Sequence, residues 1–255
     1  MTVELNHRIN GPYDAPVVVF SNSLGASMEM WTPQIPALSN RFRVLRYDQR
    51  GHGDSPVPAA PWDLSDMGHD LLNLLDRNGI ERVHFVGLSM GGAAGMWLAL
   101  HAPERIDRLV LLCTSARFGS AELWSERAAA VREHGTESAA DAGIERWFTA
   151  AFREREPAVV ARYRAMIAAQ PDEGYARCCG VLERTDLREE VSAIAAPTLV
   201  VAGAQDPSTP PDPDGKLLAE RIPGARFEIL DPAAHLASVE RAETVTDQIL
   251  DHLDT

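Results

Sequence analysis

The sequence lacks the long apolar run that a membrane helix needs. No stretch of its 255 residues approaches the roughly 18 consecutive apolar residues of a spanning helix. The segment from Met1 to His7 has neither the basic region nor the apolar region of a secretory signal peptide. We therefore expect a soluble, cytoplasmic protein with no membrane partner.

The chain also has few cysteines, and its net charge is negative. The three cysteines are Cys113, inside an apolar run, and the adjacent pair Cys178 and Cys179, a spacing that matches neither a disulfide framework nor a zinc motif. A formal net charge of -13 argues against nucleic acid or an anionic membrane as a partner. We expect reduced, buried or incidental thiols, and an anionic substrate would need an arginine or lysine placed locally.

Apolar runs alternate with helical patterns along much of the chain. Continuous apolar runs are typical of strands buried on both faces of a parallel sheet, and their alternation with helices implies right-handed crossovers. We predict an α/β fold, with a mostly parallel sheet and helices on both faces. The expected strands are 3–9, 17–20, 42–47, 82–86, 106–113, 197–203 and 226–230, and the expected helices are 28–39, 64–79, 92–101, 215–222 and 237–253.

The pattern changes between residues 117 and 190, where no strand-like run occurs. The segment is helical in character, with helices expected at 122–133, 138–152, 157–169 and 173–184. We interpret it as an all-helical cap inserted into one core domain, which is made of residues 1–116 and 191–255.

A Gly-x-Ser-x-Gly segment, Gly87-Leu88-Ser89-Met90-Gly91, lies between an apolar run and a helix pattern rich in small residues. This is the order of a nucleophile elbow, in which serine sits at a strained turn and the glycines let strand and helix pass closely. By composition alone such a motif occurs in roughly one chain in ten to twenty of this size. Ser89 is the first catalytic candidate, and the remaining parts of a site must support it.

A serine nucleophile needs an imidazole to take its proton and a carboxylate to orient that imidazole. Asp206 and His235 each follow an expected strand, in loops past the carboxyl ends, where open α/β sheets place their sites. The chain order serine, aspartate, histidine is one of the known orders of such a triad. We predict the triad Ser89, Asp206 and His235.

Two other residues compete for these roles. His52 lies in the glycine-rich loop 48–55, before the serine in the chain, and we interpret that loop as a rigid support whose Asp48, Arg50 and Asp54 bind nearby backbone. Asp231 lies only four residues before the histidine and is more typical of a turn.

Acyl transfer also needs hydrogen-bond donors for the developing oxyanion. The backbone N–H of Met90 follows the nucleophile at the start of a helix, whose dipole favours negative charge. The second donor is expected in the loop after residues 17–20, at Leu24, with Gly25 allowing close approach. Many lipases carry His-Gly where this chain has Asn22-Ser23.

With these residues the sequence resembles the α/β-hydrolases and, within that superfamily, the 3-oxoadipate enol-lactonases of the β-ketoadipate pathway. The matching segments are 20–25, 47–53, 87–91, 202–207 and 233–237. The resemblance implies opening of an unsaturated lactone that carries a carboxylate, through an acyl-enzyme on Ser89, in the breakdown of aromatic compounds. It implies no metal and no organic cofactor.

A substrate carboxylate calls for a cation under the cap. Arg132 is named as a substrate-binding candidate with Trp124 and Trp147 as walls, and the further arginine candidates are Arg127, Arg146 and Arg184. Alternative functions are a carboxylesterase or perhydrolase of the same fold, or a non-catalytic ligand-binding receptor on a hydrolase scaffold.

Overall fold

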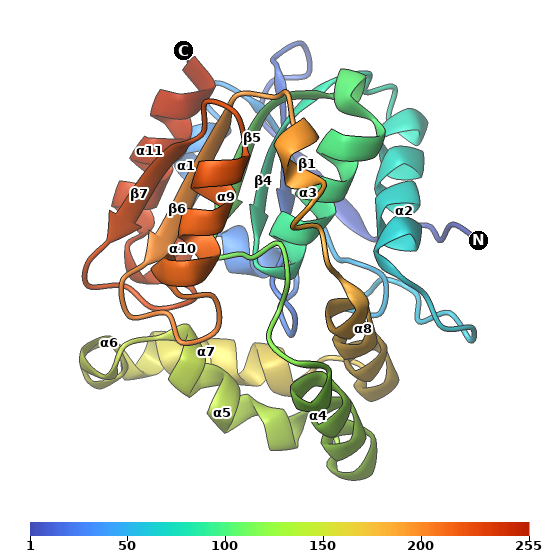
Figure 1. Cartoon of the computed structure of the whole chain (residues 1–255), viewed down its shortest axis with the longest axis vertical. Coiled ribbons are helices and arrows are strands. Elements are labelled where there is room, and N and C mark those ends of the chain that lie inside the picture. The colour runs from blue at the N-terminus through green and yellow to red at the C-terminus, as the bar shows by residue number, and fades with distance from the viewer. Residues whose placement is uncertain (255) are drawn as a thin grey trace.

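A seven-stranded sheet organises the chain in the computed structural model, which describes residues 1–254 (Figure 1). The strand order is β1-β3-β2-β4-β5-β6-β7, and all neighbours pair in parallel except β1 and β3, which are antiparallel. The mostly parallel α/β fold is therefore confirmed. The strands are β1 (His7–Asn10), β2 (Val17–Ser21), β3 (Arg43–Tyr47), β4 (Val83–Leu88), β5 (Ile106–Leu112), β6 (Thr198–Gly203) and β7 (Arg226–Leu230).

Helices cover both faces of this sheet. On one face, α3 (Met90–His101) packs against β2, β4 and β5, with α2 (Leu64–Arg77) beside it and α9 (Lys216–Arg221) near β7. On the other face, α11 (Ala242–Asp254) packs against β5, with α1 (Ile35–Leu38) beside it (Figure 1). Short helical turns complete the core: Met28–Trp31, Pro103–Arg105, Val191–Ala193, Pro211–Gly215 and α10 (Ala237–Glu240).

Five helices between β5 and β6 form a layer at the carboxyl ends of the strands, below the sheet in Figure 1. We call this layer the cap. In it α4 packs against α8, and α5 against α7. No helix within the described residues is long and apolar enough to cross a membrane. The cap helices are α4 (Ala121–His134), α5 (Glu137–Trp147), α6 (Ala150–Arg155), α7 (Pro157–Ala168) and α8 (Asp172–Arg184).

Three helices expected to be continuous are broken. The helix expected at 28–39 is a 3-10 turn followed by α1, because Pro33 between them has no N–H to donate. The helix expected at 138–152 divides into α5 and α6, where Thr149 adopts extended backbone and its side chain accepts from the Phe152 N–H. The helix expected at 237–253 divides at Arg241 into α10 and α11.

The loop 48–55 supports the core, in line with its interpretation as a scaffold. The buried Asp48 carboxylate accepts from the backbone N–H groups of Met28 and Asp54, at 2.7 and 3.1 Å. Arg50 forms a buried ion pair with Asp70 on α2, at 2.5 Å. These contacts fasten the loop after β3 to its neighbours in the core.

His52 in the same loop is fully buried, and its Nε2 accepts from the Gly25 N–H at 2.9 Å. An acceptor at Nε2 requires the neutral imidazole with its proton on Nδ1. Burial lowers the pKa of His52 to about 4, although a hydrogen bond to the Arg50 backbone opposes that shift. His52 therefore holds the loop after β2 as an uncharged group.

The depressed pKa of His52 makes the fold sensitive to acid. Between pH 6.5 and about 4 the unfolded chain binds a proton at this residue while the folded chain does not. The free energy of unfolding therefore decreases as the pH is lowered through this range. The variant His52→Gln keeps an acceptor without this titration. In urea unfolding, its deficit in stability relative to wild type should shrink by about 2 kcal/mol from pH 7 to pH 5.

The exposed His134 supplies the control: His134→Gln keeps His52 and should therefore keep the loss of stability that His52 causes between pH 7 and pH 5. Parallel pH profiles for wild type and His52→Gln would contradict the assignment of His52 as a buried neutral group.

Candidate active site

Ser89 lies at the sharp turn between β4 and α3. Its φ of 57° is in the left-handed region, which is strained for a non-glycine residue. A Cβ at Gly87 would lie 2.3 Å from the Gly91 carbonyl oxygen, and one at Gly91 would lie 2.2 Å from the Ser21 carbonyl oxygen. Both glycines are thus required by the close crossing of strand and helix.

Asp206 follows β6 and His235 follows β7, and their side chains meet. The Asp206 Oδ2 atom lies 2.8 Å from His235 Nδ1, and both side chains are buried. Burial raises the pKa of the Asp206 carboxyl, but the charge of His235 and hydrogen bonds from His235, Thr209 and Ser208 outweigh it, leaving the pKa below its usual value. An ionised Asp206 orients the imidazole and stabilises its protonated form.

His235 and Ser89 line one cavity beneath the cap. The structure thus brings the three predicted triad residues to the carboxyl ends of β4, β6 and β7. The two competitors lie elsewhere: His52 binds the Gly25 N–H, and Asp231 is exposed in the turn before Pro232.

Leu24 and Met90 are both buried near the nucleophile, and Leu24 also lines the catalytic cavity. Within residues 1–254, neither backbone N–H donates to a protein acceptor. Met90 is the first residue of α3, and the first N–H groups of a helix have no partner within the helix. The N–H groups of Leu24 and Met90 are therefore available to an oxyanion.

Asn22 stands where many lipases have histidine, and it is fully buried. Its Nδ2 donates to the Tyr47 carbonyl at 2.8 Å, and its Oδ1 accepts from Trp31 Nε1 at 3.0 Å. Gln49 donates to the Asn22 carbonyl at 3.0 Å. The loop that carries Leu24 is therefore fixed by contacts with β3 and its following loop.

The cap places aromatic and basic side chains over the triad. Trp124 from α4 and Trp147 from α5 line the cavity, and so do Arg127 and Arg146. Arg132, named from the sequence, does not line it: it is exposed and pairs with Glu173 at 2.8 Å. The packing of α4 turns Arg132 outward, so the structure offers Arg127 and Arg146 in its place. Arg184 is also outside the cavity and donates to the Trp62 carbonyl.

Among residues 1–254 neither Arg127 nor Arg146 forms an ion pair with a carboxylate, and Arg127 hydrogen-bonds the Tyr175 side chain. Burial lowers the pKa of the Arg146 guanidinium, and the like charge of Arg127 lowers that pKa further. Arg127 lies over the Trp124 ring, 4.7 Å from its centroid. Two cations that form no ion pair, in a partly buried cavity, favour an anionic ligand.

Sequence reasoning missed several residues at this site. Thr209 donates to Asp206 Oδ2 at 2.7 Å, and its N–H and that of Ser208 donate to Oδ1. Tyr175 from α8 also lines the cavity. The run Asp206-Pro-Ser-Thr209 is a typical side-chain-to-backbone turn and signals the role of Thr209, whereas nothing local signals Tyr175.

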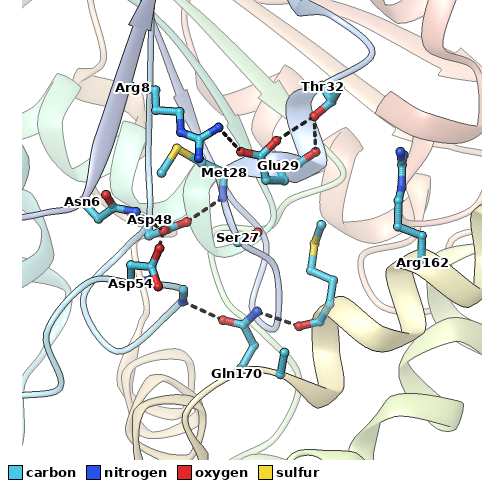
Figure 2. Close-up of a pocket in the computed structure, with 13 residues that line it drawn as sticks. Asn6, Arg8, Ser27, Met28, Glu29, Thr32, Asp48, Asp54, Arg162 and Gln170 are labelled. Atoms are coloured by element: carbon cyan, nitrogen blue, oxygen red, sulfur yellow. Dashed lines mark hydrogen bonds and ion pairs between the residues drawn. The ribbon is translucent and has the colours of Figure 1, made fainter.

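A second cavity of about 590 Å³ lies at the seam between core and cap, and it is larger than the catalytic one, which is about 40 Å³ (Figure 2). Figure 2 shows several of its polar groups bonded to protein: Asp48 accepts from Met28, Glu29 pairs with Arg8, and Gln170 accepts from the Gly53 N–H. None of the triad residues lines this cavity, so we assign it no catalytic role.

Neither the cysteines nor a metal cluster offers a second reactive centre among residues 1–254. The three cysteines are buried, and burial raises the pKa of each thiol, so none is a thiolate nucleophile. Within the described part of the chain, no group of three or more His, Cys, Asp or Glu side chains is arranged to hold a metal ion.

Comparison with known proteins places this geometry in a family. The model of the α/β hydrolase fold matches residues 16–242. The 3-oxoadipate enol-lactonase 2 of Acinetobacter baylyi is 41% identical over 241 residues, which cover 94% of this chain and 90% of that protein.

Solved structures agree with this comparison. The enol-lactonase from Burkholderia xenovorans LB400 has a TM-score of 0.96 and 44% identity, covering 98% of this chain and 96% of that chain. A thermophilic esterase from Thermogutta terrifontis has a TM-score of 0.93 and 30% identity, covering 99% and 93%. The chain therefore belongs to the α/β-hydrolase family and, within it, to the family of the 3-oxoadipate enol-lactonases.

Proposed function

We propose that this enzyme hydrolyses 3-oxoadipate enol-lactone to 3-oxoadipate, with Ser89, Asp206 and His235 as its catalytic triad. We infer the reaction from its similarity to the enol-lactonases. The observation that carries the substrate assignment is the pair Arg127 and Arg146, two cations in the cavity that Ser89 and His235 line. The substrate carboxylate would form the ion pair that these two arginines do not form with a carboxylate within residues 1–254.

Acylation begins when the Ser89 hydroxyl attacks the ring carbonyl carbon and its proton passes to His235. The N–H groups of Leu24 and Met90 hold the tetrahedral oxyanion. Collapse breaks the ring C–O bond and expels an enolate, and the proton that His235 took from Ser89 passes to this leaving group, which becomes a ketone. This leaving group needs little help from an acid, because its charge is delocalised.

Deacylation uses the same groups in reverse order. His235, once neutral again, removes a proton from water, and the water oxygen attacks the ester carbonyl carbon on Ser89. The second oxyanion occupies the same pair of N–H donors. Collapse returns the proton to the Ser89 oxygen and releases 3-oxoadipate.

Removal of the nucleophile tests the chemistry. Ser89→Ala should lower kcat for loss of the enol-lactone chromophore by about 10⁴-fold or more, because acylation is lost. The circular dichroism spectrum should remain that of wild type. Ser192→Ala, a change at an exposed serine, is the control for expression and handling. Turnover by Ser89→Ala at the wild-type rate would exclude Ser89 as the nucleophile.

Removal of a cation tests the substrate. Arg146→Gln should lower kcat/KM for the enol-lactone by about 10- to 100-fold through a raised KM, the size expected for a charge-assisted contact. Arg132→Gln removes an arginine outside the cavity and should change kcat/KM by less than about threefold.

A neutral aryl ester separates the enol-lactonase from the carboxylesterase alternative. For that substrate Arg146→Gln should keep the wild-type kcat/KM, because no carboxylate is bound. Wild-type preference for neutral aryl esters over the enol-lactone, or equal losses on both substrates, would count against carboxylate recognition by Arg146.

A further inference from the structure

The cap is hydrogen-bonded to the loop that carries the catalytic histidine. The last carbonyls of a helix have no partner within the helix and need donors from elsewhere. At the end of α5, the Arg146 carbonyl accepts from the His235 N–H at 3.3 Å, and the Trp147 carbonyl accepts from the Leu236 N–H at 2.9 Å. The cap segment beside the cavity and the backbone of His235 are thus joined directly.

Glu240, the last residue of α10, adds a side-chain connection at the same place. Its Oε2 atom accepts from the N–H of Ala234 at 3.1 Å and from the N–H of Thr149 at 3.3 Å. Its Oε1 atom accepts from the Thr149 hydroxyl. Glu240, Thr149 and Ala234 are all buried, so water does not replace these bonds readily.

The His235 loop is held on its other side by further contacts. Arg241 donates to the Asp231 carbonyl at 3.0 Å, and the Ala233 carbonyl accepts from the Gln205 N–H at 2.8 Å. The second contact links this loop to the residue before Asp206. The position of the imidazole between Asp206 and Ser89 therefore depends on a few hydrogen bonds to its neighbouring backbone.

We propose that Glu240 is a positioning residue that fastens the His235 loop to the cap through Ala234 and Thr149. It does not touch the reacting atoms. It fixes the backbone on one side of His235 while α5 fixes the other, so the imidazole stays aligned for proton transfer. The inference rests on the proposed function in that it takes His235 to be the catalytic base.

Two pairs of variants test this role. Glu240→Ala leaves the buried N–H groups of Ala234 and Thr149 without an acceptor, whereas Glu240→Gln presents one carbonyl oxygen to both and its NH₂ group to the Thr149 hydroxyl. Thr149→Val removes the hydroxyl, whereas Thr149→Ser keeps it. Glu243→Ala, at an exposed glutamate on α11, is the matched control.

Glu240→Ala and Thr149→Val should lower kcat for the enol-lactone by about tenfold to a hundredfold, because small displacements of a catalytic group are costly. The KM should change by less than about threefold, since the cavity cations are untouched. Glu240→Gln, Thr149→Ser and Glu243→Ala should stay within about threefold of wild type.

The rate of Ser89 labelling by a fluorophosphonate probe reports on His235 without the lactone, and it should fall in parallel with kcat. If wild type is labelled but does not open the enol-lactone, the proposed substrate fails while labelling rates still test Glu240. If Glu240→Ala does not fold, the Thr149 pair decides. The role of Glu240 is excluded if the folded variants keep wild-type labelling rates, or if only their thermal stability changes.

Discussion

The close crossing of β2 and α3 at Gly91 is the constraint on which the rest of the site depends. With only 2.2 Å between a Cβ at this position and the Ser21 carbonyl oxygen, no larger residue fits without moving the strand. Two residues before this crossing, Ser89 has the left-handed backbone conformation in the turn between β4 and α3. The same approach brings the start of α3 beside the loop after β2, so the two proposed oxyanion donors come from adjacent elements.

Buried polar contacts then hold the loops that the sheet leaves free. A loop after a parallel strand has no ladder partners, and each of its buried N–H and C=O groups must find another one. In the loop after β2, Gln49 donates to the Asn22 carbonyl and His52 accepts from the Gly25 N–H. In the loops after β6 and β7, Asp206 accepts from the N–H groups of Ser208 and Thr209, and Glu240 accepts from the Ala234 N–H. His52, a rival for the catalytic base in the sequence, therefore serves to fix the backbone beside the site.

The sequence predicted those features that have a local cause. The strands of a parallel sheet appear as apolar runs, and α2 begins at Leu64, as expected, after a capping box formed by Asp63 and Asp66. The breaks at Thr149 and Arg241 could not be predicted, because Thr149 bonds with Glu240, a residue 91 positions away. The choice between Arg132 and Arg146 likewise depends on which face each cap helix turns inward. That orientation follows from packing between helices, for which single-sequence patterns carry little information.

The charge distribution explains how an acidic protein can select an anionic ligand. A formal net charge of -13 repels anions at long range, but surface charges are screened within about 8 Å at physiological ionic strength. Arg127 and Arg146 lie in a partly buried cavity, where each charge is less well solvated than at the surface. Burial and the like charge of Arg127 lower the pKa of Arg146, and in the proposed function the substrate carboxylate offsets this unfavourable pairing of charges. The Arg146 carbonyl also accepts a hydrogen bond from the His235 N–H, so the residue proposed to bind the substrate carboxylate contacts the backbone of the proposed base directly. The proposed recognition of the substrate carboxylate and the proposed proton transfer by His235 therefore both depend on the end of α5.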